Sequence, residues 1–487
     1  MQAGEIARRL RQAGVGADGD AGTHRRSAHP HRAGAAVGAE GGLHDGYRGQ
    51  QGGAQGNRHD QGGGAEHDLA GGGLGNAGAW RRRRQPGIPA GLLVGAFAHA
   101  ALRRRAGRGA PQPVGPHGIA ALELSVGATQ HFADSYAGAR TAFLAAAEAA
   151  GAAVESLPHP LKGPDNEALA TDVARLGPAQ ARKVFLAMSG THGGEGYCGS
   201  GCQTGLLREG LATRLPRDTA VVLVHAINPH GFAHLRRVTE DNVDLNRNFV
   251  DHAKPHPANP GYAELHPHLI PTDWDEAGRA AADRGLAAFV ARHGGAAYQQ
   301  AVSGGQYTHA DGLFFGGRAP TWSNRTLRAL VARHCAGAAA VAFIDFHTGL
   351  GPRGYGEPIS ITDPDCPADK LTRAWFGPEV TNPMAGTSTS ARVVGTVAEA
   401  FADGLAPGTA FAGLALEYGT LPLGQVLEAL RGDHYLACHG TPGSAQWREL
   451  KARMRAAFYG EEAAWKTSVF TRAADFALRA LDGLAQA

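Results

Sequence analysis

Cysteine is scarce in this chain of 487 residues, and long apolar runs are missing. Five cysteines, an odd number, do not make the dense disulfide framework of small secreted proteins, so a reducing compartment is the simpler expectation. The longest apolar stretch, residues 88–102, is interrupted by proline, glycine and histidine, and falls short of the ~20 residues that span a membrane. The N-terminus lacks the apolar segment of a secretory signal. We therefore expect a cytoplasmic protein with no membrane partner.

Strong charge of either sign is also missing. The formal net charge is +3, and the arginine excess is local, in residues 81–84 and 103–105, so nucleic acid is not indicated as a partner. Cys198 and Cys202 are four residues apart, but no second Cys or His pair has the spacing of a structural zinc site. We interpret them as small buried thiols.

Lysine is absent from the first 161 residues, since the first lysine of the chain is Lys162. Residues 1–127 are rich in Gly, Ala, Arg and His and contain one Phe, one Tyr and one Trp. Such a segment cannot bury enough apolar surface to offset the entropy of ordering it, so we predict that it is disordered. A mis-assigned start is a further hypothesis, which a native N-terminus near residue 1, measured by intact mass, would contradict. Residues 128–487 are predicted to form one catalytic domain.

Short apolar runs alternate with helical patterns after residue 128. Four runs predict buried strands, at residues 184–189, 220–227, 339–346 and 414–418. Apolar residues at spacings of three and four predict helices between and around them. The helices are expected at residues 132–150, 204–214, 276–293, 326–334 and, as a pair, 445–484. This alternation predicts an α/β fold with a largely parallel sheet.

Polar clusters follow these strands. They read SGTHGGEG (189–196), NVDLNRNF (242–249), DFHTG (345–349) and LEYGT (416–420). Ligands of open α/β sheets bind beyond the carboxyl ends of the strands, so we expect the four clusters to meet in one crevice.

Three side chains in these clusters have the chemistry of a catalytic zinc site. Such a site takes three protein ligands from His and carboxylate and leaves a fourth position for water. His192 and Glu195 are close enough to bind one ion from a single glycine-rich loop, and His347 comes from another strand end. In a chain with 24 histidines an H-x-x-E alone arises by chance. The prediction of one Zn²⁺ ion therefore depends on the presence of the other polar clusters that follow the predicted strands.

Together the motifs resemble those of the zinc metallocarboxypeptidases of the carboxypeptidase A type and of the related aspartoacylase and succinylglutamate desuccinylase group. The resemblance covers about residues 129–450 and looks like an uncharacterised bacterial branch. It implies a single three-layer domain with a mixed central sheet. The matching positions, in chain order, are His192 and Glu195, then Asp244, Asn246 and Arg247, then His347, and finally Glu417.

The resemblance also implies roles. Glu417 would be the general base that takes a proton from zinc-activated water. Arg247 and Asn246 would hold a substrate carboxylate, for which the planar fork of arginine is suited. Arg237 would polarise the scissile carbonyl, although Arg236 stands beside it. Asp244 would orient the first zinc histidine.

Several positions stay open at this stage. Asp345 is either a similar orienting group or a buried ion-pair partner. No Tyr lies between Tyr355 and Glu417, where carboxypeptidase A-type enzymes carry a mobile tyrosine, so Tyr307 or Tyr355 would have to supply that hydroxyl. Four histidines of a loop suggest a second metal, but loop histidines are more often solvated. They are His252, His256, His266 and His268.

Three functions remain in competition. The first is a carboxypeptidase, a zinc metallopeptidase that removes a C-terminal residue from a peptide. The second is a deacylase of N-acyl amino acids. Both need a substrate with a free carboxylate, so Arg247 does not separate them. The third is a catalytically silent zinc-binding protein, against which Glu417 counts because a structural site needs no base. The oligomeric state cannot be read from the sequence.

Overall fold

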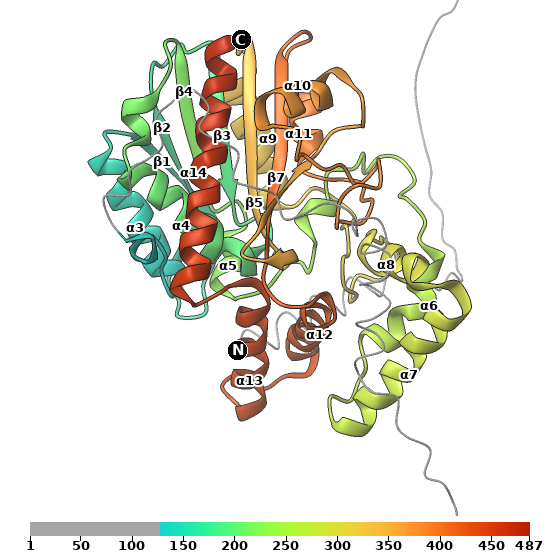
Figure 1. The fold of residues 1–487 in the computed structure, drawn as a ribbon. Helices are drawn as coiled ribbons and strands as arrows, with labels where there is room; N and C mark the ends of the chain where they lie inside the picture. Colours follow the sequence, from blue (N-terminus) through green and yellow to red (C-terminus); the bar gives the residue numbers. More distant parts are fainter. Residues whose placement is uncertain (1–126) are drawn as a thin grey trace, which may run out of the picture. The chain divides into compact units, whose positions relative to one another are not determined.

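The structure, a computed structural model, describes residues 127–487 and contains one seven-stranded sheet (Figure 1). The strand order is β1-β2-β4-β3-β5-β7-β6. The strands are β1 (Ala153–Lys162), β2 (Ala168–Leu176), β3 (Lys183–Ser189), β4 (Thr219–His225), β5 (Ala340–Arg353), β6 (Gly356–Ser360) and β7 (Ala410–Gly419). The four strands β4, β3, β5 and β7 are parallel, whereas β1, β2 and β6 join antiparallel at the edges. The α/β class and the mixed sheet are as predicted.

The four predicted strands are β3, β4, β5 and β7, and β5 runs seven residues past the predicted end at Phe346. The edge strands β1 and β6 and the inner strand β2 were not expected. β1 contains two prolines and is mostly exposed, so it lacks the continuous apolar run by which buried strands are recognised. The segment predicted to be disordered, residues 1–127, lies outside the described residues except for Gly127.

Helices cover both faces of the sheet. α3 (Tyr136–Ala149), α4 (Gly196–Arg208), α10 (Pro367–Phe376) and α14 (Ala463–Gln486) pack on one face, and Figure 1 shows α14 along the sheet. α9 (Trp322–Cys335) and α11 (Ala398–Gly404) pack on the other. The predicted apolar stripe of α14 is core, since Phe476, Ala480, Leu481 and Leu484 are fully buried.

A second apolar cluster lies apart from the sheet core. It joins α6 (Pro260–Leu269), α7 (Glu276–His293) and α8 (Gly295–Ser303) to α12 (Leu423–His439) and α13 (Ala445–Phe458). The short helix α5 (Pro229–Ala233) follows β4. Among the described residues no helix is long and apolar enough to cross a membrane.

His225 at the end of β4 makes the stability of this fold depend on pH. Its ring is fully buried, stacks on Phe143 and shares a 2.8 Å hydrogen bond with Ser200. Burial lowers the pKa of His225 to about 4. The unfolded chain therefore takes up a proton near pH 6.5 that the folded chain does not. We expect the free energy of unfolding to decrease by about 3 kcal/mol from this group as the pH falls from 6.5 to 4.

Denaturant unfolding at several pH values measures this effect. Replacing His225 by Phe keeps an aromatic ring beside Phe143 and removes the titrating group. The pH dependence between 6.5 and 4 should shrink in His225→Phe. An unchanged dependence would assign it to other groups.

Candidate metal centre

The loop after β3 carries the first two candidate ligands and is held by backbone contacts. Gly193 lies so close to the next polypeptide segment that a Cβ atom there would collide with the backbone of Gly231 and Phe232. The amides of Gly193 and Gly194 donate to the carbonyls of Arg237 and Arg236, at 3.1 and 2.9 Å. Only glycine fits this approach, which explains the glycine that follows His192.

The structure brings His192, Glu195 and His347 together. One donor atom from each lies within 4.8 Å of the others, and all three side chains are buried. Nδ1 of His192 lies 2.8 Å from Oε1 of Glu195, and Nδ1 of His347 lies 2.9 Å from Oε2. Two imidazole nitrogens and a carboxylate around one point are a donor set that suits zinc.

A second carboxylate orients each imidazole from behind. Nε2 of His192 lies 3.1 Å from Oδ1 of Asp244, and Nε2 of His347 lies 2.6 Å from Oδ2 of Asp345. Thr191 in turn donates to both oxygens of Asp345. Metal-binding histidines in proteins usually donate their other ring N–H in this way, which leaves the nitrogen facing the ion unprotonated. Asp345 therefore holds His347 as Asp244 holds His192.

The charges in this cluster favour an ionised Glu195. Burial alone would raise the pKa of Glu195, but the contacts with His192 and His347 outweigh burial and lower it strongly. Burial would lower the pKa of His347, but Asp345 and Glu195 raise it well above its usual range. An ionised carboxylate between two imidazole rings is a setting in which a divalent cation would be well accommodated.

Arg237 is the arginine that faces the centre. Its Nε donates to Asp244 at 2.9 Å, and its Nη1 donates to Oε1 of Glu195 at 3.2 Å. Its Nη2 lies 2.8 Å from Nε2 of His192, the same nitrogen that lies beside Asp244. Nε2 can donate to Asp244 or accept from Arg237, but not both, so its protonation state decides whether Nη2 is engaged.

Arg236, the neighbouring candidate, is not in the centre. Its Nε donates to Asp433 at 3.3 Å, and Lys451 donates to the other oxygen of Asp433 at 2.6 Å. Lys451 also donates to the carbonyls of His234 and Leu235, where Leu235 has a positive φ of 48°. This network holds the backbone segment that carries Arg237 in place. Its removal would therefore make the position of Arg237 less well defined, although the network does not contact the candidate ligands.

Glu417 lies two residues before the end of β7, paired with His347 on β5 and with Glu357 on β6. It is buried, and its Oε1 accepts a 3.1 Å hydrogen bond from the amide of Leu350. Burial, and next the negative charge of Glu195, raise the pKa of Glu417 to about 8. A cation at the three donor atoms would lower that pKa, because a nearby positive charge favours the carboxylate.

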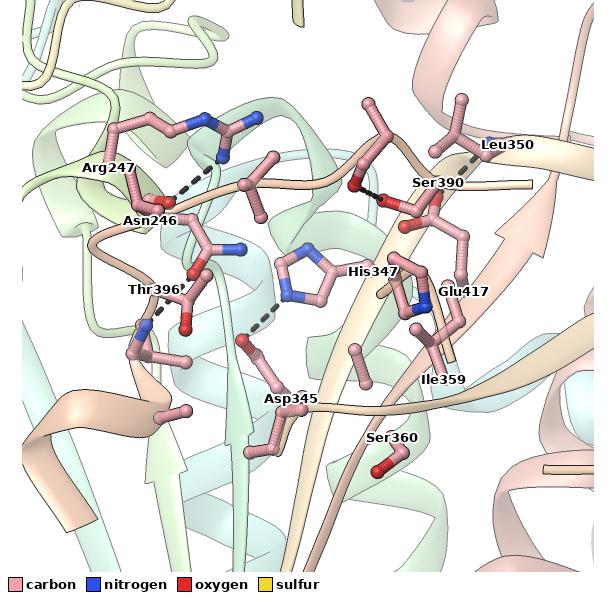
Figure 2. Close-up of a pocket in the computed structure, with 18 of the residues that line it drawn as sticks. Asn246, Arg247, Asp345, His347, Leu350, Ile359, Ser360, Ser390, Thr396 and Glu417 are labelled. Carbon is pink, nitrogen blue, oxygen red and sulfur yellow. Dashed lines mark hydrogen bonds and ion pairs between the residues drawn. The ribbon is translucent and has the colours of Figure 1, made fainter. Parts of the chain in front are cut away.

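Asn246 and Arg247 lie on the opposite side of His347 from Glu417 (Figure 2). Oδ1 of Asn246 accepts a 2.9 Å hydrogen bond from the amide of Val397. Arg247 is buried and donates to the carbonyls of Asn246 and Ser303, at 2.9 and 2.5 Å. Its Nε has no hydrogen-bond partner among the described residues. Its Nη1 lies 3.9 Å from Oδ1 of Asp244. Burial lowers the pKa of Arg247. This side chain has unused capacity for an anion.

One cavity of about 770 Å³ is lined by the candidate ligands, by the two arginines and the asparagine beside them, and by two carboxylates: His192, Glu195, His347, Arg237, Arg247, Asn246, Asp345 and Glu417. Asp244 does not line it. The predicted convergence of the polar clusters is therefore observed. The proposed substitutes for the mobile tyrosine are not found there. The hydroxyl of Tyr307 donates to the carbonyl of Arg247 at 2.6 Å, and Tyr355 packs against Arg472. Sequence order does not show which hydroxyls are already engaged.

Other candidate groups do not assemble a site. In residues 127–487 the only cluster of three or more potential ligands is His192, Glu195 and His347. His252 and His256 lie 3.1 Å apart and pair with each other. Cys198 and Cys202 are free, buried thiols of α4, as we interpreted them from the sequence.

Several solved structures are similar to this chain in fold. Carboxypeptidase A from Helicoverpa armigera is 13% identical, with 66% of this chain and 74% of that chain covered and a TM-score of 0.32. The murein-tripeptide amidase MpaA from Escherichia coli O157 is 16% identical, with 60% and 93% covered and a TM-score of 0.28. The succinylglutamate desuccinylase from Chromobacterium violaceum is 15% identical, with 64% and 72% covered and a TM-score of 0.29. The similarity is distant.

Sequence comparison gives the family. No curated protein matches the chain. The family described as "Protein of unknown function (DUF2817)" matches residues 132–472, which include every candidate ligand and Glu417. The chain therefore belongs to the DUF2817 family.

Proposed function

We propose that this protein is a zinc-dependent hydrolase of an amide bond close to a carboxylate. The observation that carries the proposal is the orientation of the two imidazoles. Each turns Nδ1 toward Glu195 and Nε2 toward a buried acid, Asp244 or Asp345. In that arrangement Nε2 of each ring can carry the proton and donate it to the acid, which leaves Nδ1 unprotonated. Nδ1 of His192, Nδ1 of His347 and the carboxylate of Glu195 are then available to an ion.

A zinc ion held by His192, Glu195 and His347 would acidify a water molecule and polarise a carbonyl oxygen. Glu417 would take the proton from that water and deliver it to the departing nitrogen. Its position beside His347 across the β5–β7 pairing puts the carboxylate at the edge of the centre. The amide of Leu350 holds one oxygen of Glu417. The other oxygen would take the proton.

Arg237 would stabilise the negative charge that develops on the carbonyl oxygen of the substrate. When Nδ1 of His192 binds an ion, Nε2 carries the proton and donates to Asp244. It can then no longer accept from Arg237, so Nη2 is released toward the cavity that Arg237 lines. A donor placed there stabilises an oxyanion.

Arg247 and Asn246 would bind the substrate carboxylate. We expect Arg247→Met to raise the KM for a substrate with a free carboxylate by about 100-fold, because a buried charged hydrogen-bonding group is lost. The measurement compares each N-acyl amino acid with its neutral amide. The native protein should prefer the acid and Arg247→Met should not. Arg325→Met, which changes an exposed arginine, is the matched control. A retained preference for the acid in Arg247→Met would remove this residue from substrate binding.

Peptides with a free C-terminus and N-acyl amino acids both satisfy this geometry. Hydrolysis of a panel of blocked dipeptides and N-acyl amino acids by zinc-loaded protein would separate the carboxypeptidase from the deacylase. A chelator should abolish the activity and added zinc should restore it. Stoichiometric zinc without hydrolysis of any panel member would favour the silent zinc-binding protein.

A further inference from the structure

Two arginines of the candidate centre share one aromatic ring. The guanidinium carbon Cζ of Arg237 lies 5.1 Å from the centroid of the Phe314 ring, and Cζ of Arg247 lies 5.8 Å from it. A cation within about 6 Å of a ring centroid is attracted by the negative face of the ring. Burial, and also the nearby positive charge of Arg237, lower the pKa of Arg247. The two cations are thus close enough to repel each other, so their surroundings must hold them in place.

Asp244 and Phe314 each contact both arginines. Asp244 accepts from Nε of Arg237 at 2.9 Å and lies 3.9 Å from Nη1 of Arg247. Phe314 lines the cavity, whereas Asp244 does not. An aromatic face attracts a guanidinium without taking up its N–H groups as a carboxylate does. Phe314 therefore holds the two cations on the cavity side and leaves their donors available to a substrate anion.

The backbone of Phe314 is in the left-handed region, with a φ of 53°. Six non-glycine residues of the described chain have a positive φ, and four of them are Asn or Asp, which tolerate it. The other two are Phe314 and Leu235, which lies two residues before Arg237. A bulky side chain is disfavoured in this region and persists only where its surroundings determine the conformation. Packing in an apolar cluster does not require such a backbone, so the conformation points to a role for the ring.

The loop between α8 and α9 supplies these surroundings. The amide of Gln306 donates to the carbonyl of Phe314 at 3.1 Å, and Nε2 of Gln306 donates to the carbonyl of Leu313 at 3.2 Å. The carbonyl of Phe315 accepts a 2.7 Å hydrogen bond from the amide of Asp244. These hydrogen bonds fix the ring relative to the acid that contacts both arginines.

We propose that Phe314 is a positioning residue that sets the spacing of Arg237 and Arg247, and through it the distance between the scissile carbonyl and the carboxylate of the substrate. This inference rests on the proposed function, in which Arg237 stabilises the oxyanion and Arg247 binds the carboxylate. Because both guanidinium groups lie at one ring, the two groups that they bind are also close together. The site selects an amide whose carboxylate is on the carbon next to the nitrogen.

A pair of isomeric substrates measures this spacing with zinc-loaded full-length protein. The best panel substrate is prepared with alanine and with β-alanine as the residue that carries the carboxylate. The β-alanine isomer moves the carboxylate one carbon further from the amide nitrogen, and a misplacement of about 1 Å can cost about 100-fold in rate. We expect the native protein to prefer the alanine isomer at least about 100-fold in kcat/KM, and Phe314→Leu to prefer it less than about 10-fold.

Further variants separate the ring from the backbone. Phe314→Gly fits a positive φ without strain and removes the ring, so it should lose the preference as Phe314→Leu does. Phe314→Tyr keeps the aromatic face and should keep the preference. Phe315→Leu makes the same change at the next residue, whose ring packs against Val243 and Ala310, and should also keep it. General damage to the fold would lower kcat/KM for both isomers alike, whereas a changed spacing alters their ratio.

Binding of dicarboxylates separates this inference from the proposed function. Malonate, succinate and glutarate can each place one carboxylate at Arg237 and the other at Arg247. In calorimetry the native protein should bind one of the three at least about 10-fold more tightly than the others, since a missed charged hydrogen bond costs about that much. Phe314→Leu should bind all three alike. That result with no hydrolysis of any amide would support the role of Phe314 and contradict the proposed function.

The hydrolysis ratios give the opposite outcome. Hydrolysis with the same preference in the native protein, Phe314→Leu and Phe314→Gly would overturn the role of Phe314 and leave the proposed function intact. Equal hydrolysis of the two isomers by the native protein would overturn it as well.

Discussion

Replacing Glu417 by Gln should reduce the hydrolysis rate by about 10²- to 10⁴-fold, because a positioned general base contributes a factor of that size. Glutamine has the same shape and can still accept from the Leu350 amide, so the fold should be unchanged. It cannot take a proton from water. The kcat of the native protein and of Glu417→Gln on the best panel substrate is the measurement.

Zinc content separates this loss from damage to the centre. Glu417 is not one of the three candidate ligands, so Glu417→Gln should keep one zinc per chain. Glu462→Gln, which changes an exposed glutamate, is the matched control. Equal kcat values in native protein and Glu417→Gln would contradict the role of base.

Replacing His192 by Ala should abolish hydrolysis and lower zinc affinity by more than about 100-fold, since loss of a group that merely supports a ligand already costs 10- to 100-fold. The change also leaves Glu195 and Asp244 each without one partner. Competition with a chromogenic chelator measures the affinity. His256→Ala, a histidine outside the cluster, should bind zinc as the native protein does. Full zinc affinity in His192→Ala would show that the metal binds elsewhere.

The central strands could be predicted because each is a short apolar run that ends in polar residues. β3, β4, β5 and β7 are buried along almost their whole length, and such strands are recognisable without knowledge of their partners. β6 is only five residues long and contains a proline. Its place depends on hydrogen bonds to β7, which local sequence does not show.

The candidate ligands could be predicted because the chemistry of zinc restricts residue types and because strand ends meet at one edge of the sheet. Asp345 stayed open between two roles, and its 2.6 Å contact with Nε2 of His347 makes it the support of that ring. The sequence could not separate Arg236 from Arg237. Only the packing of α12 and α13, which carry Asp433 and Lys451, places Arg236 away from the centre.

The central claim is that one zinc ion is held by two imidazole nitrogens and a carboxylate. Zinc X-ray absorption on the zinc-loaded protein tests it most directly. The account predicts two nitrogen ligands at about 2.0–2.1 Å and oxygen ligands at about 2.0–2.2 Å, with the scattering pattern of imidazole rings. The imidazole signal should fall in His347→Ala. Sulfur at about 2.3 Å, or an imidazole signal that is the same in His347→Ala, would contradict the account.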